Sequence, residues 1–241
     1  MKNAAFLLAI IIFCSSKIVY SQDSIRNDRN EYFSKTKPST FILPAAGITY
    51  GFLTLQNKTL QKINSKILNQ VRPQDPLKKC HIDDYLQFTP GAIVFGLNAA
   101  GVHGVHQPKD AAYLYVLSNV IMNAIVFPTK HFSHELRPDN SAYSSFPSGH
   151  TSEAFASAEF LRMEYKNRSP LYGILGYAMA GMTGYLRMYN NKHWFSDIVA
   201  GAGVGIISTQ LAYCILNKIL TEKYKVAASK KMKSNINTPV F

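Results

Sequence analysis

The sequence predicts an all-α fold, a bundle of about six helices associated with a membrane. Apolar residues recur at helical spacing in several long segments, and no stretch of any length alternates apolar and polar residues as a half-buried strand does. Hydrophobic residues make up 47% of the 241 positions and charged residues only 17%. Because a typical soluble domain is about 25% charged, this chain is unusually apolar. Its length suffices for one domain with its own core.

Residues 1–21 have the pattern of a secretory signal peptide. Lys2 supplies the charged start, residues 4–13 the apolar core, and the stretch ending at Ser21 a plausible cleavage site. An uncleaved membrane anchor is the alternative. We expect a mature chain that begins at Gln22 and functions outside the cytoplasm.

Residues 22–84 are predicted to form an N-terminal arm with peripheral helices. The apolar segment 41–55 is short for a membrane span, so we expect it to lie at the interface or to pack on the bundle. After it, apolar residues at helical spacing indicate an amphipathic helix that ends at Pro73 and Pro76.

Five segments of helical character make up the predicted main domain, residues 85–218, and a lysine-rich tail follows at 219–241. They lie at about 85–105, 111–129, 149–165, 170–189 and 197–218. Residues 111–127 and 197–217 come closest to the roughly 20 apolar residues that a membrane span requires. The segment 149–165 carries three glutamates, which argues against a span. A buried helix of a soluble bundle gives the same hydropathy signal, so both interpretations stay open.

The placement of positive charge indicates a topology. Lysine and arginine gather at 162–169 and in the tail, and the positive-inside rule assigns both to the cytoplasmic side. The segments near 130–149 and 188–197 then lie together on the outer side. If 41–55 also crosses the membrane after signal cleavage, 130–149 falls inside instead, so the topology stays open.

A formal net charge of +12 indicates an anionic partner. The sequence has no compact basic stripe interleaved with aromatic residues and no nucleic-acid motif, so we expect a membrane or a phosphate and not nucleic acid. Cys80 and Cys214 permit one disulfide in an oxidising compartment, but we expect both to be structural. The sequence does not define an oligomeric state.

The stretch KHFSHELRP carries two cations seven residues apart, Lys130 and Arg137, and ends at Pro138. A compact ammonium group and a planar guanidinium group together suit a phosphate-like anion. A lysine and an arginine near a helix end also commonly cap its carbonyl groups or meet lipid head groups. This motif alone therefore does not define an anion site.

The stretch FPSGHTSEAF opens a helix-prone run with Ser148, Gly149 and His150. The glycine lets a ligand approach the backbone, and the free N–H groups of a first helical turn bind anions. The serine is a further donor and the histidine a candidate acid or base. Taken alone, the stretch favours an ordinary N-cap serine beside an incidental histidine.

The stretch RMYNNKHWFSD contains Arg187, a further anion ligand, and then His193 and Asp197 four residues apart. At this spacing the carboxylate can hold the imidazole tautomer and stabilise its charged form, which is what an imidazole nucleophile needs. The alternative makes Asp197 or Ser196 the N-cap of the last helix.

Two further histidine pairs, His103 with His106 and His131 with His134, have spacings that a transition metal accepts. We expect them instead to lie at the membrane interface or to contact the residues of the site. The prediction is that the chain uses neither a metal nor a cofactor.

In this order, Lys-x6-Arg-Pro, Pro-Ser-Gly-His and Arg-x5-His-x3-Asp resemble the type 2 phosphatidic acid phosphatase (PAP2) superfamily. That superfamily includes bacterial acid phosphatases, lipid A phosphatases and vanadium haloperoxidases. The resemblance covers about residues 85–218 and implies a helical bundle of the PAP2/haloperoxidase type. The family often has a serine before the third-motif arginine, where this chain has Leu186, a departure that bears on specificity more than on mechanism.

The resemblance also implies a role for each residue. Phosphate and its transition-state charge would be bound by Lys130, Arg137, Ser148, the Gly149 amide and Arg187. His193 would attack phosphorus to form a phosphohistidine, Asp197 would orient it, and His150 would protonate the leaving group. Water would then hydrolyse the intermediate, with no metal required.

We therefore expect a metal-independent phosphatase acting on a membrane lipid phosphate, such as lipid A, an isoprenoid diphosphate or a phosphatidyl phosphate. Its active site would face the periplasm from a bacterial inner membrane, or lie in the periplasm. A soluble periplasmic non-specific acid phosphatase is the nearest alternative. More distant ones are a vanadium haloperoxidase, in which vanadate uses the same ligands, and a non-catalytic lipid-binding protein of the same fold.

Overall fold

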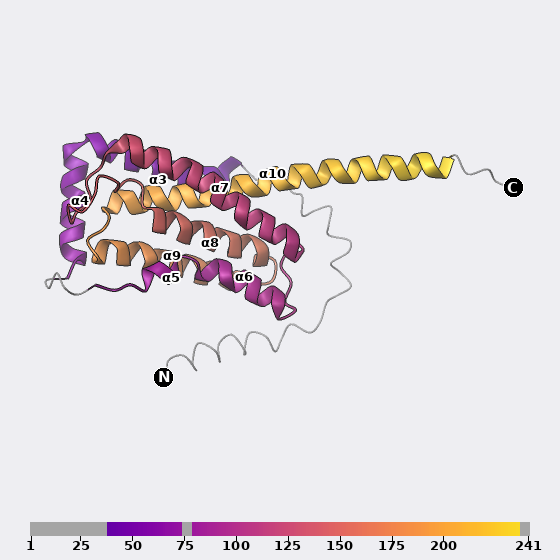
Figure 1. Ribbon diagram of the computed structural model, residues 1–241, viewed down its shortest axis with the longest axis horizontal. Coiled ribbons are helices and arrows are strands. Elements are labelled where there is room, and N and C mark those ends of the chain that lie inside the picture. Colours follow the sequence, from indigo (N-terminus) through magenta and orange to yellow (C-terminus); the bar gives the residue numbers. More distant parts are fainter. Residues whose placement is uncertain (1–37, 74–78, 237–241) are drawn as a thin grey trace. The chain divides into compact units, whose positions relative to one another are not determined.

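The computed structural model describes residues 38–73 and 79–236, with side chains described up to residue 219. All regular structure in these ranges is helical, which confirms the predicted all-α class, and it comprises eight α-helices and one 3₁₀ turn (Figure 1). The elements are η1 (Pro38–Phe41), α3 (Ile42–Gln56), α4 (Lys58–Val71), α5 (Asp83–Leu86), α6 (Thr89–Ala99), α7 (Pro108–Ser133), α8 (Gly149–Tyr165), α9 (Leu171–Tyr189) and α10 (Phe195–Ile236). The predicted signal peptide lies outside the described residues.

Helix α8 is the central element of the bundle and packs against α6, α7, α9 and α10. Most of its side chains are buried. Phe160, Leu161 and Tyr165 form a core cluster with Val94 of α6 and Leu114 of α7. Because α8 begins at Gly149, inside the Pro-Ser-Gly-His stretch, this packing fixes the place of that stretch relative to the four neighbouring helices.

Glycines allow α10 to lie very close to α8. A Cβ added at Gly205 would collide with the carbonyl oxygen of Ser152, and one added at Gly201 would lie 2.7 Å from the carbonyl oxygen of Ser148. Small residues spaced four apart let two helix backbones approach each other in this way, as they do in membrane bundles. The start of α8 is thereby held against the start of α10.

The three glutamates of α8 are buried, and each accepts a hydrogen bond from a tyrosine of a different neighbouring helix. The pairs are Tyr115–Glu153 at 2.7 Å, Tyr177–Glu159 at 2.5 Å and Tyr213–Glu164 at 2.6 Å. A buried carboxylate is tolerated when such donors compensate for its lost hydration. The glutamates therefore do not exclude an apolar environment for α8, although they lower its hydropathy.

The segment predicted as one helix over 85–105 is two helices in the structure. Helix α5 ends at Leu86 and α6 begins at Thr89, with Pro90 in its first turn. Proline suits the first turn of a helix because it has no N–H to donate to a preceding turn. Helix α6 stops at Ala99, before Gly101, whose φ of +81° is outside the helical range.

The later helices agree with the predicted positions, although two of them are longer than predicted. Helices α8 and α9 match the predicted segments 149–165 and 170–189 within one residue. Helix α7 extends beyond 111–129 at both ends, beginning at Pro108. Helix α10 continues to Ile236, so its backbone includes much of the tail that was predicted to follow residue 218.

Helices α3 and α4 pack on the bundle as peripheral elements. The apolar segment 41–55 forms α3, which lies against α10 with Gly47 and Val199 in close contact. The predicted amphipathic helix is α4, and the side chain of Asn57 caps its first turn. Figure 1 shows α4 running across one end of the bundle. There its apolar face, including Leu68, packs against Met188 and Ile198.

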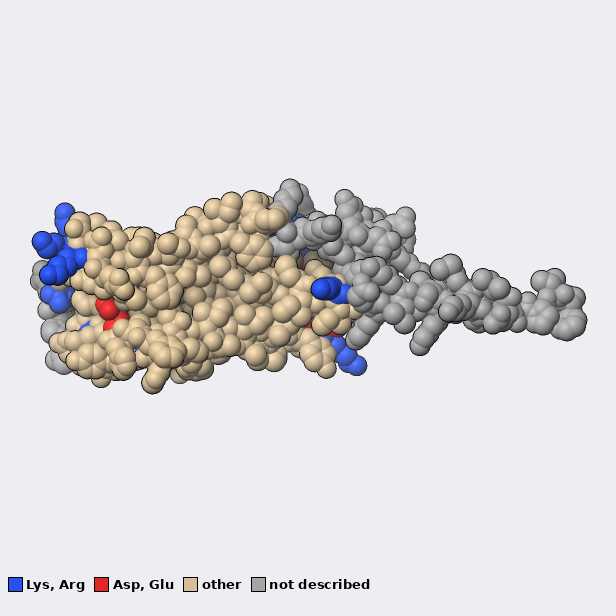
Figure 2. All heavy atoms as spheres, turned by 90° about the horizontal axis from the view of Figure 1, so that it is seen from above, with Lys and Arg blue, Asp and Glu red and all other residues tan. Residues whose placement is uncertain are grey.

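Large apolar side chains are exposed around the bundle. On α7 they are spaced along one side: Tyr113, Val116, Val120 and Phe127 are each 59–70% exposed. Helix α9 also exposes Ile174 and Met182. On the face that Figure 2 shows, described charged side chains gather toward the two ends, and the part between them carries none. Among the described residues, Pro108–Ser133 and Phe195–Ile219 are long and apolar enough to cross a membrane.

Candidate active site

Four helix ends meet at the end of the bundle that α4 crosses. They are the last turns of α7 and α9 and the first turns of α8 and α10, joined by the loops 134–148 and 190–194. The indole N–H of Trp194 donates to the carbonyl of Leu136 at 2.9 Å, which fastens one loop to the other. The amide of Ser148 donates to the carbonyl of Asp197 at 3.1 Å. All eight predicted site residues are on these ends or loops.

The start of α8 has free amide groups beside a lysine. Ser148 is the N-cap, and its hydroxyl accepts from the Thr151 amide at 3.4 Å. The amides of Gly149 and His150 precede the helical hydrogen-bond ladder, as those of a first turn do. A Cβ at Gly149 would lie 3.9 Å from Cε of Lys130, so the lysine stem runs past this turn. The arrangement suits an anion held by amide groups and an ammonium group.

Lys130 is oriented by the backbone of the following loop. Its Nζ donates to the carbonyl of Ser144 at 2.6 Å and lies 3.5 Å from that of Ser145. Two carbonyl acceptors leave one further N–H of the ammonium group for a ligand.

His193 and Asp197 are both buried and face each other. The Nδ1 atom of His193 lies 3.4 Å from Oδ2 of Asp197. The same carboxylate oxygen accepts from the Trp194 amide at 2.9 Å and from the hydroxyl of Ser145. Since Nδ1 faces the carboxylate, Nε2 is the nitrogen of His193 available to attack an electrophile.

Ser145 is a contact that sequence reasoning missed. Its side chain is fully buried, and its hydroxyl lies 3.5 Å from Nδ1 of His193 as well as bonding Asp197. It precedes the Pro-Ser-Gly-His stretch by two residues, and a serine in a loop carries no signal of its own. Only the fold brings it to Asp197, which is 52 residues away.

Four buried polar atoms in this region have no hydrogen-bond partner among the described residues: Nε of Arg137, Nε of Arg187, Oδ1 of Asn191 and Oδ1 of Asp197. Leaving a buried donor unpaired costs about 1–3 kcal/mol, so such atoms are uncommon. Two guanidinium donors without acceptors, close to an ammonium group and free helix amides, form a site to which an anion would supply the missing acceptors.

The concentration of positive charge changes the acid–base behaviour of the histidine. The pKa of His193 is well below its ordinary value, first because the ring is buried and then because Lys130 and Arg187 are near. The pKa of Arg137 is also lowered, by burial and by Arg187. His193 is therefore neutral across the physiological pH range, which is the form that a nucleophile needs.

The pKa values of His150 and Glu135 are also shifted in this environment. Burial and then Arg187 lower the pKa of His150, and hydrogen bonding to Asp84 acts in the opposite direction. Burial and the charge of Asp197 raise the pKa of Glu135 to about 7. Of these two groups, Glu135 is the one whose pKa lies near neutral pH.

Two carboxylates of α5, which were not predicted to be site residues, contact residues of the candidate site. Asp83 is buried, and its Oδ2 accepts from Nη1 of Arg187 at 2.7 Å. The Nε2 atom of His150 lies 3.0 Å from Oδ1 of Asp84. Asn190, just after α9, contacts α5 through Asp83, whose Oδ1 lies 3.3 Å from Nδ2 of Asn190, and it also bonds both the N–H and the carbonyl of Cys80.

The other sequence-predicted features have structural partners. His106 Nδ1 lies 2.8 Å from Glu164, and His103 Nδ1 lies 3.4 Å from Asn98. In the part of the chain that the structure describes, no group of three or more His, Cys, Asp or Glu residues could hold a metal ion. Cys80 and Cys214 do not form a disulfide with each other.

Leu186 is buried, at 9% exposure, where the superfamily often has a serine. It lies between the exposed Tyr185 and the buried Arg187 near the end of α9. The structure thus gives this position little contact with solvent.

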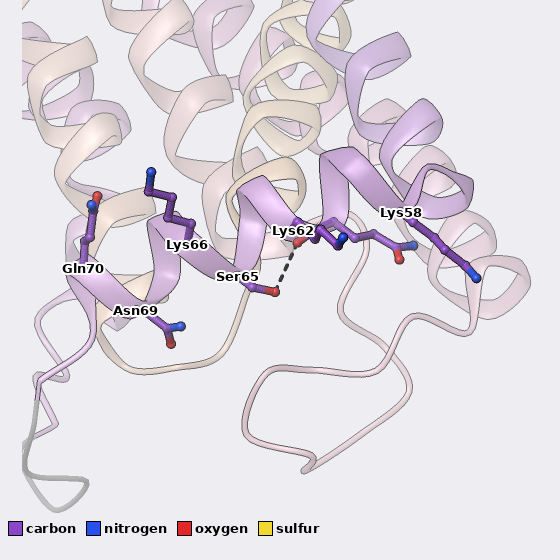
Figure 3. A pocket seen from close by; sticks show the side chains of 7 residues that line it. Lys58, Lys62, Ser65, Lys66, Asn69 and Gln70 are labelled. Carbon is purple, nitrogen blue, oxygen red and sulfur yellow. Dashed lines mark hydrogen bonds between the residues drawn. The ribbon is translucent and has the colours of Figure 1, made fainter.

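A shallow hollow on the outer face of α4 is distinct from the site. It is lined by polar side chains of this one helix (Figure 3): Lys58, Gln61, Lys62, Ser65, Lys66, Asn69 and Gln70. It contains neither a histidine nor a carboxylate among these residues. The lysines occur every fourth position on the polar side of an amphipathic helix, as they do on a solvated face.

The similarity to known proteins covers the region that contains the candidate site. The family model of the PAP2 superfamily matches residues 110–220, which include all eight predicted site residues. A lipid A 1-phosphatase of Porphyromonas gingivalis is 40% identical over 165 residues, 66% of this chain and 37% of that protein. The chain thus spans little more than a third of this relative's length.

Two solved structures are also similar. Aquifex aeolicus LpxE has 20% sequence identity and a TM-score of 0.47, over 62% of this chain and 94% of that one. A transmembrane PAP2-type phosphatidylglycerolphosphate phosphatase of Bacillus subtilis has 19% identity and a TM-score of 0.49, over 75% and 96% respectively. Residues 110–220, which contain the three motifs in their order, match the PAP2 superfamily.

Proposed function

We propose that this chain is a phosphatase that removes phosphate from a membrane lipid through a phosphohistidine intermediate. The observation that carries the proposal is the pair of buried, unpartnered Nε donors of Arg137 and Arg187 in the same pocket of positive charge as the buried His193. A phosphoryl group would supply acceptors for both guanidinium groups and an electrophile for the imidazole.

Binding of phosphate would use the cations and the start of α8. Arg137 and Arg187 would donate through their free N–H groups, and Lys130 through the N–H that its two carbonyl acceptors leave. The Gly149 amide and the Ser148 hydroxyl would complete the site. These donors are already in place, so they would stabilise the charge that develops on the phosphoryl oxygens without a costly rearrangement.

The chemistry would proceed in two steps. Nε2 of His193 attacks phosphorus, the bond from phosphorus to the leaving oxygen breaks, and that oxygen takes a proton from His150. In the second step the now neutral His150 removes a proton from water, and the resulting hydroxide displaces His193 to release inorganic phosphate. Asp197 keeps Nδ1 of His193 protonated and stabilises the imidazole when it carries positive charge.

A lipid is the preferred substrate class because the site is at one end of a bundle with an apolar exterior. The exposed side chains of α7 and α9 and the two helices of spanning length support a bundle embedded in a membrane. Its catalytic end would then lie at the head-group level, where the phosphate of a lipid is located. The name of the 40% identical relative makes the 1-phosphate of lipid A the first substrate to test.

We further propose that the site faces the periplasm of a bacterial inner membrane. Loops 134–148 and 190–194 lie together, whereas the basic stretch 162–169 is at the opposite end of α8. The positive-inside rule puts that basic stretch in the cytoplasm and hence the catalytic loops outside.

The test is phosphate release by the purified protein from lipid A, phosphatidate and an isoprenoid diphosphate, in detergent and with a chelator present. We expect turnover of a lipid substrate and a loss of about four orders of magnitude or more for His193→Ala, because covalent catalysis is then abolished. Undiminished turnover by His193→Ala would contradict the proposed mechanism. Turnover of water-soluble monoesters alone, by protein found in the soluble fraction, would point to a periplasmic acid phosphatase instead.

Vanadate separates the remaining alternatives. Because vanadate resembles the transition state of phosphoryl transfer, we expect it to inhibit at low concentration. Halide oxidation in the presence of vanadate and peroxide would indicate a haloperoxidase. Lipid binding with no turnover of any substrate would indicate a non-catalytic protein.

A further inference from the structure

A second histidine–carboxylate pair lies beside the His193–Asp197 pair. The Nε2 atom of His150 lies 3.0 Å from Oδ1 of Asp84, and Asp84 belongs to the four-residue helix α5. Helix α5 precedes residues 110–220, which match the superfamily model. We propose that Asp84 is a positioning residue that holds His150 as the general acid of the phosphatase reaction.

The orientation of the ring follows from this contact. A carboxylate is an acceptor only, so Nε2 of His150 carries the hydrogen that bonds Asp84. The other ring nitrogen, Nδ1, is then the one that delivers a proton to the leaving oxygen. The carboxylate thus holds one nitrogen of the imidazole, and the other nitrogen transfers the proton.

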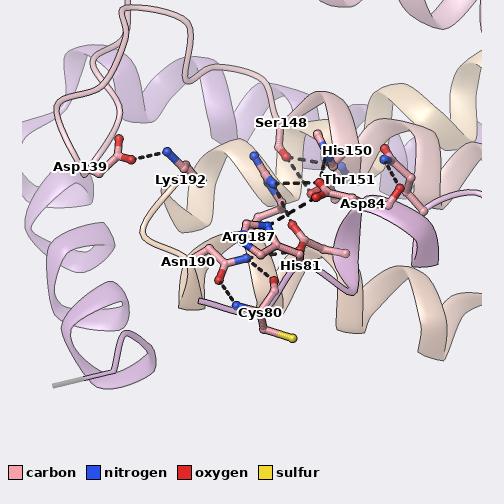
Figure 4. A network of polar contacts seen from close by, with 12 residues as sticks. Cys80, His81, Asp84, Asp139, Ser148, His150, Thr151, Arg187, Asn190 and Lys192 are labelled. Atoms are coloured by element: carbon pink, nitrogen blue, oxygen red, sulfur yellow. Dashed lines mark hydrogen bonds and ion pairs between the residues drawn. The ribbon is translucent and has the colours of Figure 1, made fainter. Parts of the chain in front are cut away.

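The placement of α5 supports a specific function for this contact. Asp83, the neighbour of Asp84, is buried against Arg187 at 2.7 Å and bonds Asn190 at 3.3 Å, so α5 is fastened to the end of α9. Asp84 is anchored through that neighbour and yet is half exposed, with its carboxylate toward His150 (Figure 4). The pair Asp83–Asp84 therefore places one carboxylate on the phosphate-binding arginine and the other on the proton donor.

The protonated form of His150 depends on the carboxylate of Asp84. Arg187 disfavours the protonated ring, and so does burial, whereas Asp84 and the more distant Asp83 favour it. His193 is a further neighbour with which His150 interacts, and His81 lies 3.6 Å from the other oxygen of Asp84. A general acid must hold its proton until the leaving group departs. Without Asp84, the dominant charged neighbour of His150 is a cation.

The inference rests on the proposed phosphatase function, and leaving-group dependence tests it. We compare Asp84→Asn with wild type on an alkyl phosphate lipid and on 4-nitrophenyl phosphate, whose leaving phenolate needs no proton. General acid catalysis contributes about 10²–10⁴-fold, so we expect kcat on the alkyl substrate to fall about tenfold or more, with little change in KM. The fall on the aryl substrate should be several times smaller. Asp84→Glu should restore part of the loss.

Asp110→Asn is the matched control, because it makes the same chemical change in the first turn of α7, away from the catalytic end of that helix. It should behave as wild type on both substrates. The basic limb of the pH profile gives a second readout. Removing a carboxylate lowers the pKa of the imidazole, so kcat/KM of Asp84→Asn should begin to fall at a lower pH than that of wild type.

A third readout does not need turnover. Titration of the His150 ring by NMR in histidine-labelled protein should give a lower pKa in Asp84→Asn than in wild type. Equal kinetics on the alkyl substrate and an unshifted basic limb, in an active wild type, would overturn the role of Asp84 and leave the phosphatase intact. If the wild type is inactive, the proposed function fails. If the wild type is inactive and the pKa of His150 is the same in Asp84→Asn as in wild type, the pairing with Asp84 is overturned as well.

Discussion

Most of the candidate site was predictable residue by residue, because the chemistry is encoded in short motifs. Lys130 and Arg187 are cations in the last turns of α7 and α9, Arg137 lies in the loop after α7, and the spacing of His193 and Asp197 brings Nδ1 and Oδ2 within 3.4 Å. Asp83 and Asp84 could not be predicted. They act on residues 104 and 66 positions away, and such contacts leave no local pattern in the sequence.

The protonation states of the two histidines predict an acidic optimum. His193 must be neutral to attack, and its pKa is well below 6.5, so activity persists as pH falls through 6.5. His150 must be protonated, and its pKa is also below its ordinary value, so kcat/KM falls as pH rises through that value. We expect the maximum of kcat/KM below pH 6.5, after correction for the substrate's second ionisation. A value still rising between pH 6.5 and 8 would contradict this assignment.

The unpartnered Nε of Arg137 predicts that lysine cannot replace this residue. Arg137→Lys keeps the charge but loses the guanidinium fork. Since a hydrogen bond to a charged group is worth about 1.5–3 kcal/mol, we expect kcat/KM to fall by roughly 10- to 150-fold and inhibition by inorganic phosphate to weaken. Arg168→Lys is the control, because Arg168 donates its Nε to the carbonyl of His103 instead. Equal losses in the two variants would argue against phosphate binding by Arg137.

At the scale of elements, hydrophobic periodicity predicted the positions of the long helices but not how they pack. The segment 85–105 reads as one helix, yet Pro90 starts a second one. The glutamates of α8 lower its hydropathy, because a sequence does not indicate that a tyrosine from another helix bonds each of them. Helix ends and interhelical polar pairs depend on tertiary contacts, which periodicity does not encode.

The contact between α8 and α10 predicts opposite effects for two glycine substitutions. Gly205→Ala forces the helices apart at Ser152, and overpacking of this kind costs about 1–3 kcal/mol. Gly181→Ala, on α9, meets nothing within 4 Å and should be neutral or stabilising by up to about 1 kcal/mol, because alanine is the better helix former. Thermal unfolding in detergent measures both. A Gly205→Ala protein as stable as wild type would contradict the packing.

At the scale of the whole molecule, the described bundle has a catalytic end and an opposite end, and the proposed topology places them on different sides of a membrane. Tyr143, in a catalytic-end loop, is 64% exposed, and Asn167, after α8, is also exposed. We introduce cysteine at each position in a background in which Cys14, Cys80 and Cys214 are serine. A membrane-impermeant maleimide should label Tyr143→Cys in intact spheroplasts and Asn167→Cys only after lysis. The reverse pattern would contradict the periplasmic orientation.

The central claim is that phosphate is transferred to His193, and trapping the intermediate tests it most directly. The purified protein is mixed with a lipid substrate, quenched in base, in which phosphohistidine survives, and digested for mass spectrometry. The account predicts one added phosphoryl group on the peptide that contains His193, and none in His193→Ala. Steady turnover of the same substrate with no phosphoryl group on His193, or with the group on His150, would contradict it.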